Sequence, residues 1–554
     1  MHRTGCPVVL ALLTICFLCP SDAAAANALG RDSDPVVMSG SNLPSLSGLS
    51  PPAVVAFRYD AGWTQIPVQI DERAVNDYGV VYDSAAVGLT TLAYTDPGTF
   101  MGPDPDPTFD ADDELVFMAR DAGGLAAAGD PAGVIAGTRV RVEVTDPLTL
   151  QSAYVYLFRS DGSLAPDAGA DYVAYNFNLL SGPYLTTYNT TVGPNPENSA
   201  VTTAFYRTHF SDRWIRDEIN LFAGGATGVD ILDRHKNLFA PGNCARSENS
   251  FSAGEGAFFV NKDGPVRAIR SYMGANSGPF TQRTHLFYER RHDVTTNLRV
   301  HAISGVMDFY DYSPAATGLT YYNDLNTSGT AIDGSPDAPV LGPIVWEMVS
   351  GAQGTLVYAE WIDTNIPAFA YTSYYLDAVT PPVVQCTGDG TAYGSSGVQV
   401  AQPIPSTDPA LGAVNFMDFY RVAYAEGPGQ TVALAAARND QAKSPLTTAV
   451  TTPTGIGLDH RVPGYALAQN FPNPFSETTR IGFSIPEGSG ASIRVFDVSG
   501  RLVRTLHRAG GRGEDGFVSW NGTDEHGRRV ASGIYFYRLH SGTFMQTRKM
   551  VILE

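Results

Sequence analysis

One short segment, Tyr206–Glu218, carries the residue types that abstraction of a carbon-bound proton requires. Within it His209 offers a base, Arg213 offers a cation and Trp214 offers an aromatic surface. A lyase that acts on uronic acids needs a histidine or tyrosine base, and an arginine that neutralises the carboxylate so that the α-proton becomes acidic. His209 and Arg213 are therefore the first pair of candidate catalytic residues.

A second segment, His285–His292, repeats these residue types. Successive side chains of a strand point to opposite faces, which places His285, Glu289 and Arg291 on one face. His285 and Arg291 are the second candidate pair. The same residues also suit cross-strand ion pairing on a solvated β-face, and this structural role stays open. Hydrolysis of a glycosidic bond would need two carboxyl groups across a cleft, and the sequence singles out no such pair.

An acidic, proline-stiffened stretch between two β-type runs is the candidate metal site. Closely spaced carboxylates offer hard oxygen ligands, of which Ca²⁺ takes roughly six to eight. The spacing lacks the glycine that an EF-hand loop places at its sharp turn, and a solvated acidic turn is the alternative. Ca²⁺ is the one cofactor that the sequence suggests. The candidate ligands are Asp104, Asp106, Asp110, Asp112, Asp113 and Glu114.

Tryptophans form a further group with two possible roles. Exposed indole rings stack on sugars, whereas in a β-sandwich a tryptophan usually belongs to the core. Both roles stay open for Trp63, Trp214, Trp346 and Trp361.

The charge balance restricts the classes of partner. The 554-residue chain has 36 Lys and Arg against 56 Asp and Glu, a formal net charge of −20. The segment from Tyr465 onward is slightly basic, so the upstream body carries the whole acidic excess. Such a body repels phosphate backbones and anionic lipid, which disfavours binding to nucleic acid or to a membrane surface. Cations and glycans are the partner classes that remain.

Residues 1–26 have the pattern of a cleavable secretory signal. His2 and Arg3 are basic, Val8–Leu18 is apolar, and an alanine-rich run follows. Pro20 and Asp22 end the apolar span before it is long enough to cross a membrane. We therefore expect a secreted or surface-attached mature chain without a transmembrane segment.

Two cysteines, Cys244 and Cys386, remain after removal of that signal. In an exported protein this pair can oxidise, so we expect a disulfide. Two independent buried cysteines are the alternative.

The elements that must position these residues are strands. Short β-type runs recur between Gly, Pro and Asp clusters, and Thr138–Val144 alternates valine with charged residues. No long helical stripe is present, and the connections are too short for crossover helices. The sequence predicts an all-β protein made of tandem antiparallel β-sandwiches with a C-terminal Ig-like sandwich.

Composition shifts suggest five regions. A stretch before the tail is rich in small residues and contains several prolines, which predicts an exposed linker. The expected regions are a signal peptide at 1–26, an N-terminal β-rich domain at 27–165, a large β-sandwich at 166–443, a linker at 444–463 and an Ig-like domain at 464–554.

The tail carries several ordered motifs. They are Gln469–Phe475 (QNFPNPF), Val495–Arg501, Trp520–Asp524 and Ala531–Arg538. Together they resemble the C-terminal sorting domain of type IX secretion substrates, a domain similar to the Ig-like domain of the flagellar hook-capping protein. The resemblance covers the tail only. It implies recognition by an outer-membrane translocon, followed by release or surface attachment.

The leading functional hypothesis is an exported β-sandwich protein with a binding or structural role. A secreted carbohydrate-active enzyme, either a polysaccharide lyase or a glycoside hydrolase, is the alternative. An open groove lined by His, Arg and aromatic residues would favour the enzyme, and a closed sandwich would favour binding.

Overall fold

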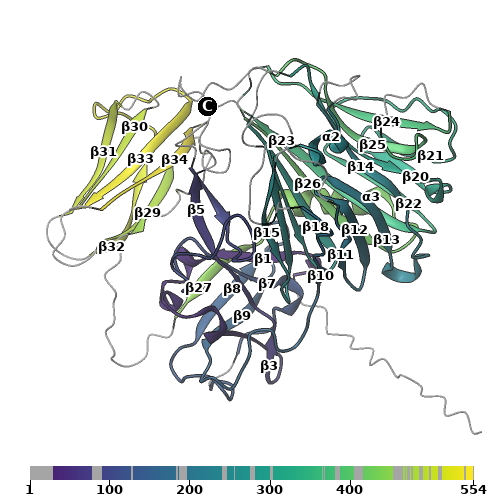
Figure 1. Cartoon of the computed structure of the whole chain (residues 1–554). Helices are drawn as coiled ribbons and strands as arrows, with labels where there is room; N and C mark the ends of the chain where they lie inside the picture. The colour runs from purple at the N-terminus through teal and green to yellow at the C-terminus, as the bar shows by residue number, and fades with distance from the viewer. Residues whose placement is uncertain are drawn as a thin grey trace, which may run out of the picture. The chain divides into compact units, whose positions relative to one another are not determined.

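The computed structural model is all-β, as the sequence predicts (Figure 1). The chain divides into two compact units, Met1–Pro453 and Thr454–Glu554. None of the helices in the described residues is long and apolar enough to span a membrane. The structure describes residues 29–77, 90–126, 129–182, 185, 196–239, 246–254, 256–274, 281–299, 303–364, 366, 368–380, 387–404, 416–452, 466–467, 470, 475, 478–485, 491–497, 501–509, 514–541 and 544–552.

The N-terminal part of the first unit builds two sheets around one apolar core. One sheet has the strand order β27-β8-β9-β2-β3 and the other has the order β1-β7-β4, while β5 pairs with β6. The bounds are β1 Pro35–Ser39, β2 Val54–Tyr59, β3 Trp63–Ile66, β4 Gln69–Asp71, β5 Arg73–Asp77, β6 Thr90–Tyr94, β7 Glu114–Met118, β8 Val140–Thr145, β9 Ser152–Arg159 and β27 Thr447–Thr451.

Strand β27 comes from the segment predicted to be a linker. It pairs antiparallel with β8, with Thr447 opposite Thr145. Leu446 and Val450 pack against the N-terminal core, and this apolar contact explains why the segment is ordered. The predicted linker therefore begins as a strand of the first unit, and its remainder from residue 453 lies outside the described residues.

The rest of the first unit is a β-sandwich. A nine-stranded sheet with the order β15-β16-β17-β18-β26-β23-β22-β20-β21 faces a four-stranded sheet with the order β14-β19-β25-β24. A further sheet has the order β10-β11-β12-β13. The bounds are β10 Ala174–Asn176, β11 Ser199–Thr202, β12 Tyr206–Asp212, β13 Ile215–Leu221, β14 Leu232–Phe239, β15 Ala257–Lys262, β16 Ala268–Met273, β17 Gln282–Phe287, β18 Arg291–Arg299, β19 Val306–Tyr312, β20 Thr320–Asn323, β21 Asn326–Ala331, β22 Trp346–Gly351, β23 Gly354–Thr364, β24 Thr372–Ala378, β25 Ala392–Val400 and β26 Phe416–Glu426.

In the described part of the first unit two α-helices accompany these strands, α2 Glu248–Ser252 and α3 Val432–Lys443. Helix α3 uses Ala435 and Ala442 to pack on a cluster that includes Trp346 and Tyr424 of the nine-stranded sheet. Small alanine side chains allow the helix to lie close to the large aromatic rings. The face of the sheet under α3 is therefore apolar.

The opposite face of the nine-stranded sheet, which meets the four-stranded sheet, is unusually polar. Cross-strand pairing sets Val294, Arg421 and Glu360 side by side on β18, β26 and β23. In the neighbouring row Tyr358 stands opposite Glu347. Because directly opposed residues share a face, the register itself carries these ionisable groups into the interior.

The second unit is a small sandwich of two antiparallel sheets, ordered β28-β29-β32 and β31-β30-β33-β34. Trp520, Tyr535 and Tyr537 lie in its core. The rings of Trp520 and Tyr535 meet edge to face at 5.5 Å, which fits the predicted core position of both. The bounds are β28 Ala466–Leu467, β29 Thr479–Ile485, β30 Ala491–Asp497, β31 Leu502–Ala509, β32 Glu514–Trp520, β33 Gly533–Ser541 and β34 Phe544–Ile552.

Candidate functional site

The first predicted catalytic pair is separated by the fold. His209 lies on β12, where Nδ1 is 2.7 Å from an Asp217 carboxylate oxygen and Nε2 is 2.9 Å from the Asn198 side-chain oxygen. Arg213 lies in the turn before β13 and is fully buried, and its Nη2 donates to the Phe251 carbonyl at 2.8 Å. His209 thus lies at a partly exposed position of the sheet. Arg213 instead donates a hydrogen bond to the backbone of α2 from the protein interior.

The second predicted pair is also engaged in internal contacts. His285 is fully buried, with Nδ1 3.0 Å from His292 Nε2. Burial, together with His292 and nearby arginines, holds the pKa of His285 well below its usual value, so the ring is neutral. Arg291 donates to Asp293 and, at 2.8 Å, to Asp34 of the N-terminal part. The structure does not bring these four candidates into one cleft.

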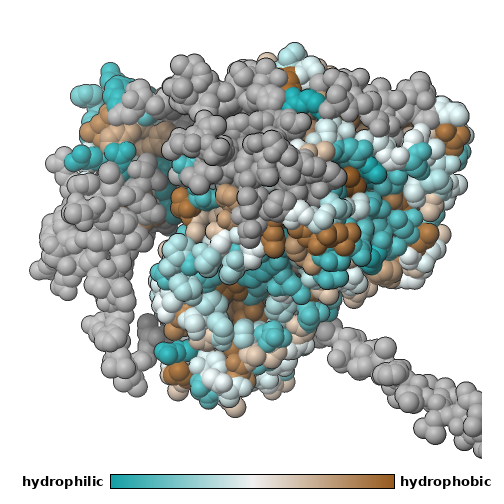
Figure 2. Space-filling model, in the orientation of Figure 1, coloured by the Kyte–Doolittle hydropathy of each residue, from teal (hydrophilic) through white to brown (hydrophobic). Residues whose placement is uncertain are grey.

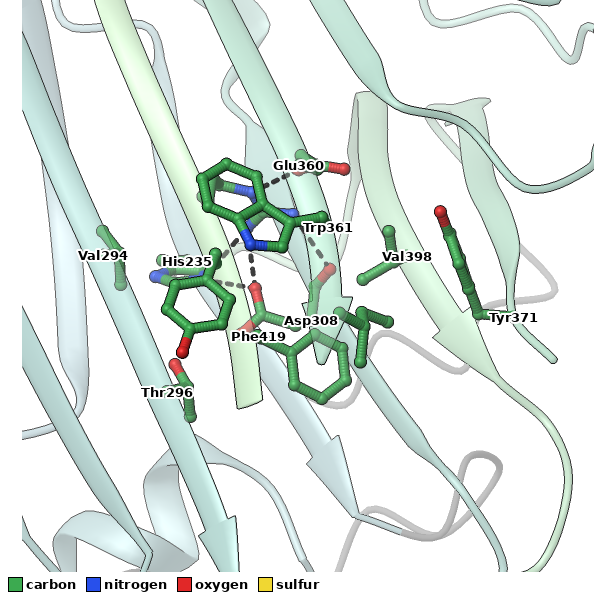
Figure 3. A pocket seen from close by; sticks show the side chains of 12 residues that line it. His235, Val294, Thr296, Asp308, Glu360, Trp361, Tyr371, Val398 and Phe419 are labelled. Carbon is green, nitrogen blue, oxygen red and sulfur yellow. Dashed lines mark hydrogen bonds and ion pairs between the residues drawn. The ribbon is translucent and has the colours of Figure 1, made fainter. Parts of the chain in front are cut away.

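A different group of ionisable residues does converge, between the two facing sheets (Figure 3). Asp308 on β19 accepts from Arg283 at 2.7 Å and from Arg421 at 2.7 Å, and lies 2.8 Å from His235 Nε2. Arg421 also donates to Glu360 on β23. His235, Asp308, Glu360 and Arg421 border a pocket with about 360 Å³ of space between atoms, part of it open to solvent.

The electrostatics of this cluster fix the protonation states. Burial lowers the pKa of His235 to about 3, so its ring is neutral. Burial alone would raise the pKa of Asp308, but His235, Arg283 and Arg421 together hold that pKa far below its ordinary value. Asp308 is therefore an anion whose charge is shared among its partners, an arrangement that suits a structural ion cluster.

Two glutamates beside this cluster have raised pKa values, in contrast to the lowered pKa of Asp308. Burial and the neighbouring Glu360 raise the pKa of Glu347 to about 8, and burial raises the pKa of Glu360 against the effect of Arg421. One buried oxygen of each glutamate, Oε1 of Glu347 and Oε2 of Glu360, has no hydrogen-bond partner. The signal that sequence reasoning missed was a lone acid within an apolar strand, as in Trp346–Val349 and Tyr358–Trp361.

Glu347→Gln is expected to stabilise the protein at alkaline pH. The folded glutamate keeps its proton up to about pH 8, against an ordinary pKa of 4.5. Its stability contribution is therefore fully present below pH 4.5 and is lost as pH rises through 8. The amide should gain on the order of 2 kcal/mol over wild type at alkaline pH, and almost nothing near pH 4.5. Urea unfolding at both pH values measures this.

Glu143→Gln on the half-exposed face of β8 is the matched control, and it should show no such pH-dependent gain. An equal gain at both pH values for Glu347→Gln would contradict a raised pKa.

The acidic loop is split by the structure into two sets. In the first set, the Glu114 carboxylate is paired with two arginines, because Arg73 and Arg267 each donate to it at 2.7 Å. Asp106 Oδ1 accepts from the Thr108 hydroxyl at 2.8 Å. Asp113 is almost fully buried and accepts from the Asp110 amide at 2.9 Å.

A residue outside the predicted loop joins the second set. The carboxylates of Glu72, Asp104 and Asp113 each bring an oxygen to within 4.8 Å of the others. Burial, with the charges of Asp113 and Asp104, raises the pKa of Glu72 to about 7. Glu72 directly follows β4 in the sequence and lies more than thirty positions before the acidic loop that begins at Asp104. Hydrogen bonding by Asp110 and burial raise the pKa of Asp112 to about 6.

The tryptophans divide between the two roles left open by the sequence. Trp214 and Trp346 are buried core residues. Trp63 is partly buried among aromatic rings, with Arg139 over its face at 5.1 Å from the ring centroid. Trp361 is half-buried and lies parallel to Tyr420, with ring centroids 5.1 Å apart and an angle of 9°.

The predicted disulfide partners Cys244 and Cys386 lie outside the described residues, as does the predicted signal peptide at 1–26. Both therefore stay predictions.

Comparison with known proteins confirms the identity of the tail. Residues 469–553 match the family of the secretion system C-terminal sorting domain, the type IX domain that the tail motifs resemble. A domain of this family implies secretion or attachment to the cell surface, and contact with the secretion machinery. No curated protein matches the chain.

Solved structures that align with the chain include the following two. One is an α-mannosidase from Enterococcus faecalis V583, with 8% identity, a TM-score of 0.35, and coverage of 88% of this chain and 54% of that one. This chain thus spans about half the length of that protein. The other is a putative aldose 1-epimerase from Escherichia coli K12, with 12% identity, a TM-score of 0.21, and coverage of 46% and 100%. Likeness at these TM-scores carries neither a fold nor an activity over to this chain.

Proposed function

We propose that this chain is an exported binding protein whose body recognises neutral glycans at the cell surface or in the medium. The sorting domain at 469–553 supports the destination, and the predicted signal at 1–26 supplies the first export step. Export then proceeds through the outer-membrane translocon that reads the tail. The role of the body rests on the observations that follow.

The observation that carries the glycan proposal is the aromatic pair of Trp361 and Tyr420. The two rings lie parallel on neighbouring strands, and both residues are only half-buried. Partly exposed aromatic residues can contact the apolar face of a sugar ring, and Lys443 Nζ, 6.0 Å from the Trp361 ring centroid, adds a polar group beside them. Because the body is acidic, anionic polysaccharides are repelled and neutral ones are the expected ligands.

Binding is favoured over catalysis by the way the ionisable residues are used. The four candidate catalytic residues are all held in hydrogen bonds within the fold, and the ion cluster around Asp308 lies between two sheets. On the face drawn in Figure 2, hydrophobic residues form small patches among hydrophilic ones. These features favour binding, and the partly open pocket that Arg421, Trp361 and Tyr420 line is the expected binding surface.

Affinity electrophoresis against neutral and anionic polysaccharides, with detection of reaction products, tests the role of the body. We expect at least one neutral glycan to retard the protein without being cleaved, and Trp361→Ala to reduce the retardation roughly tenfold or more. Phe222→Ala is the matched control, since Phe222 is an exposed aromatic residue outside the pair. Release of products would replace the proposal by a carbohydrate-active enzyme, and absence of any retention would overturn glycan binding.

A further inference from the structure

We propose that Glu72, Asp104 and Asp113 form a Ca²⁺ site in the N-terminal part of the body. One carboxylate oxygen from each residue lies within 4.8 Å of those of the other two. This separation allows three oxygens to contact one cation at the Ca²⁺–oxygen distance of roughly 2.3 to 2.6 Å. The ligand set differs from the predicted loop, because it recruits Glu72 and releases Glu114.

The observation that points to a ligand is the state of Glu72. Both of its carboxylate oxygens are shielded from solvent, and neither has a hydrogen-bond partner. A buried carboxylate without donors is costly, because the lost hydration is not replaced. A cation between Glu72, Asp104 and Asp113 replaces that hydration with direct coordination.

The nearby protein cations do not fill this role. Lys262 Nζ lies 2.7 Å from Asp71, and Arg73 Nη1 lies 2.7 Å from Glu114. Among the described residues, no ion pair joins a lysine or arginine to Glu72, Asp104 or Asp113. Lys262 acts on Glu72 only from a distance, so the three carboxylates have no directly paired cation among the described side chains.

The fold holds two of the three ligands in place by backbone donors. Asp113 accepts from the Arg73 amide at 2.9 Å, and Asp104 accepts from the Asp106 amide at 2.8 Å. A carboxylate oxygen has a second lone pair, so these bonds leave room for a metal. The backbone carbonyl of Glu72 accepts from the Thr95 amide at 3.0 Å, which fixes that end of the site.

The ligand chemistry selects the cation. The three ligands are all carboxylates, which favour hard cations over the zinc and copper that histidine and cysteine bind. Ca²⁺ accepts irregular sets of about six to eight oxygens, whereas Mg²⁺ demands near-octahedral geometry. Water molecules complete the shell at the half-exposed side of Asp104.

The purified full-length protein tests this site after treatment with a chelator. Equilibrium dialysis with ⁴⁵Ca²⁺ should give one bound ion per chain, with a Kd on the order of 0.1 to 1 mM, as for other extracellular sites. Millimolar CaCl₂ should raise the melting temperature more than MgCl₂ or NaCl of equal ionic strength does. The test does not depend on glycan binding or on export.

Glu72→Gln and, independently, Asp104→Asn should each weaken Ca²⁺ binding at least tenfold, and Asp106→Asn should leave it unchanged. Asp106 is the matched control because it is an exposed acid of the same loop outside the ligand set. Failure of Ca²⁺ to bind, or equal weakening by Asp106→Asn, would overturn the proposal. If Glu72→Gln does not fold, Asp104→Asn on the half-exposed side alone decides between these outcomes.

Discussion

Trp520→Ala is expected to retain the protein on the cell side of the outer membrane. The indole is almost fully buried in the sorting domain, and its Nε1 donates to the Thr523 carbonyl at 2.9 Å. It also packs against Phe475 and Tyr535. Truncation of such a side chain costs about 3 to 5 kcal/mol, a large part of the roughly 5 to 15 kcal/mol that a domain has in total.

The fraction of the protein in the medium or on the cell surface, compared with the periplasm, measures this effect. Deletion of Tyr465–Glu554 should give the full loss of export. Arg494→Ala in the same domain is the matched control, because Arg494 is an exposed strand residue outside the four sorting-domain motifs, and such surface substitutions usually change stability by less than about 0.5 kcal/mol. Normal export of the deletion variant would contradict the role of the tail.

Asp308→Asn is expected to lower the free energy of unfolding of the body by about 3 to 5 kcal/mol. The substitution removes the negative charge that Arg283 and Arg421 share inside the sandwich. Both guanidinium groups then remain buried with less compensation, and an unpaired buried charge is far more costly than a lost surface pair. Urea unfolding of the full chain at neutral pH, followed by circular dichroism, measures the change.

Asp130→Asn is the control for this substitution. Its partner Arg139 lies 2.6 Å away, but the Asp130 side chain is 25% exposed, so the expected loss is below about 1 kcal/mol. Equal losses for the two variants would show that the ion cluster around Asp308 contributes no more than a surface pair.

The strands of the tail were the most predictable part of the fold. The tail was expected to be an Ig-like sandwich, and its alternating apolar runs Ala491–Asp497 and Gly533–Leu539 coincide with β30 and with most of β33. In β8, Val140, Val142 and Val144 are buried while the residues between them are half-exposed, as the alternation predicts. Alternation is a local property set by one solvated face, and for that reason a single sequence reveals it.

The interior ion cluster was not predictable in the same way. Its members lie on β14, β17, β19, β23 and β26, and only the pairing register places them together. Conversely, His285–His292 is not one strand, as its period-two interpretation assumed. It is a hairpin in which β17 ends at Phe287 and β18 begins at Arg291, so His285 and His292 lie on the same face with their ring nitrogens 3.0 Å apart. The register of distant strands is set by packing and turn geometry, which composition does not encode.

The acidic loop illustrates the same distinction. The sequence located the carboxylates of Asp104 and Asp113, but it could not identify Glu72, because that residue arrives through the pairing of β4 with β7. It also included Glu114, whose side chain is bound by Arg73 and Arg267 instead. The local sequence therefore predicted that this region is acidic, but it did not predict which carboxylates lie together and which pair with arginines.

The return of β27 to the N-terminal sheet has a consequence for the timing of folding. Thr447 pairs with Thr145 across 302 positions, and Arg31 donates to the Gln441 carbonyl across 410 positions. Contacts of such long range form slowly, because the loop must close before the contact is gained. The edge of β8 is covered only once the chain has been made as far as residue 451. Synthesis of nearly the whole body therefore precedes completion of the sheet that contains β8 and β27.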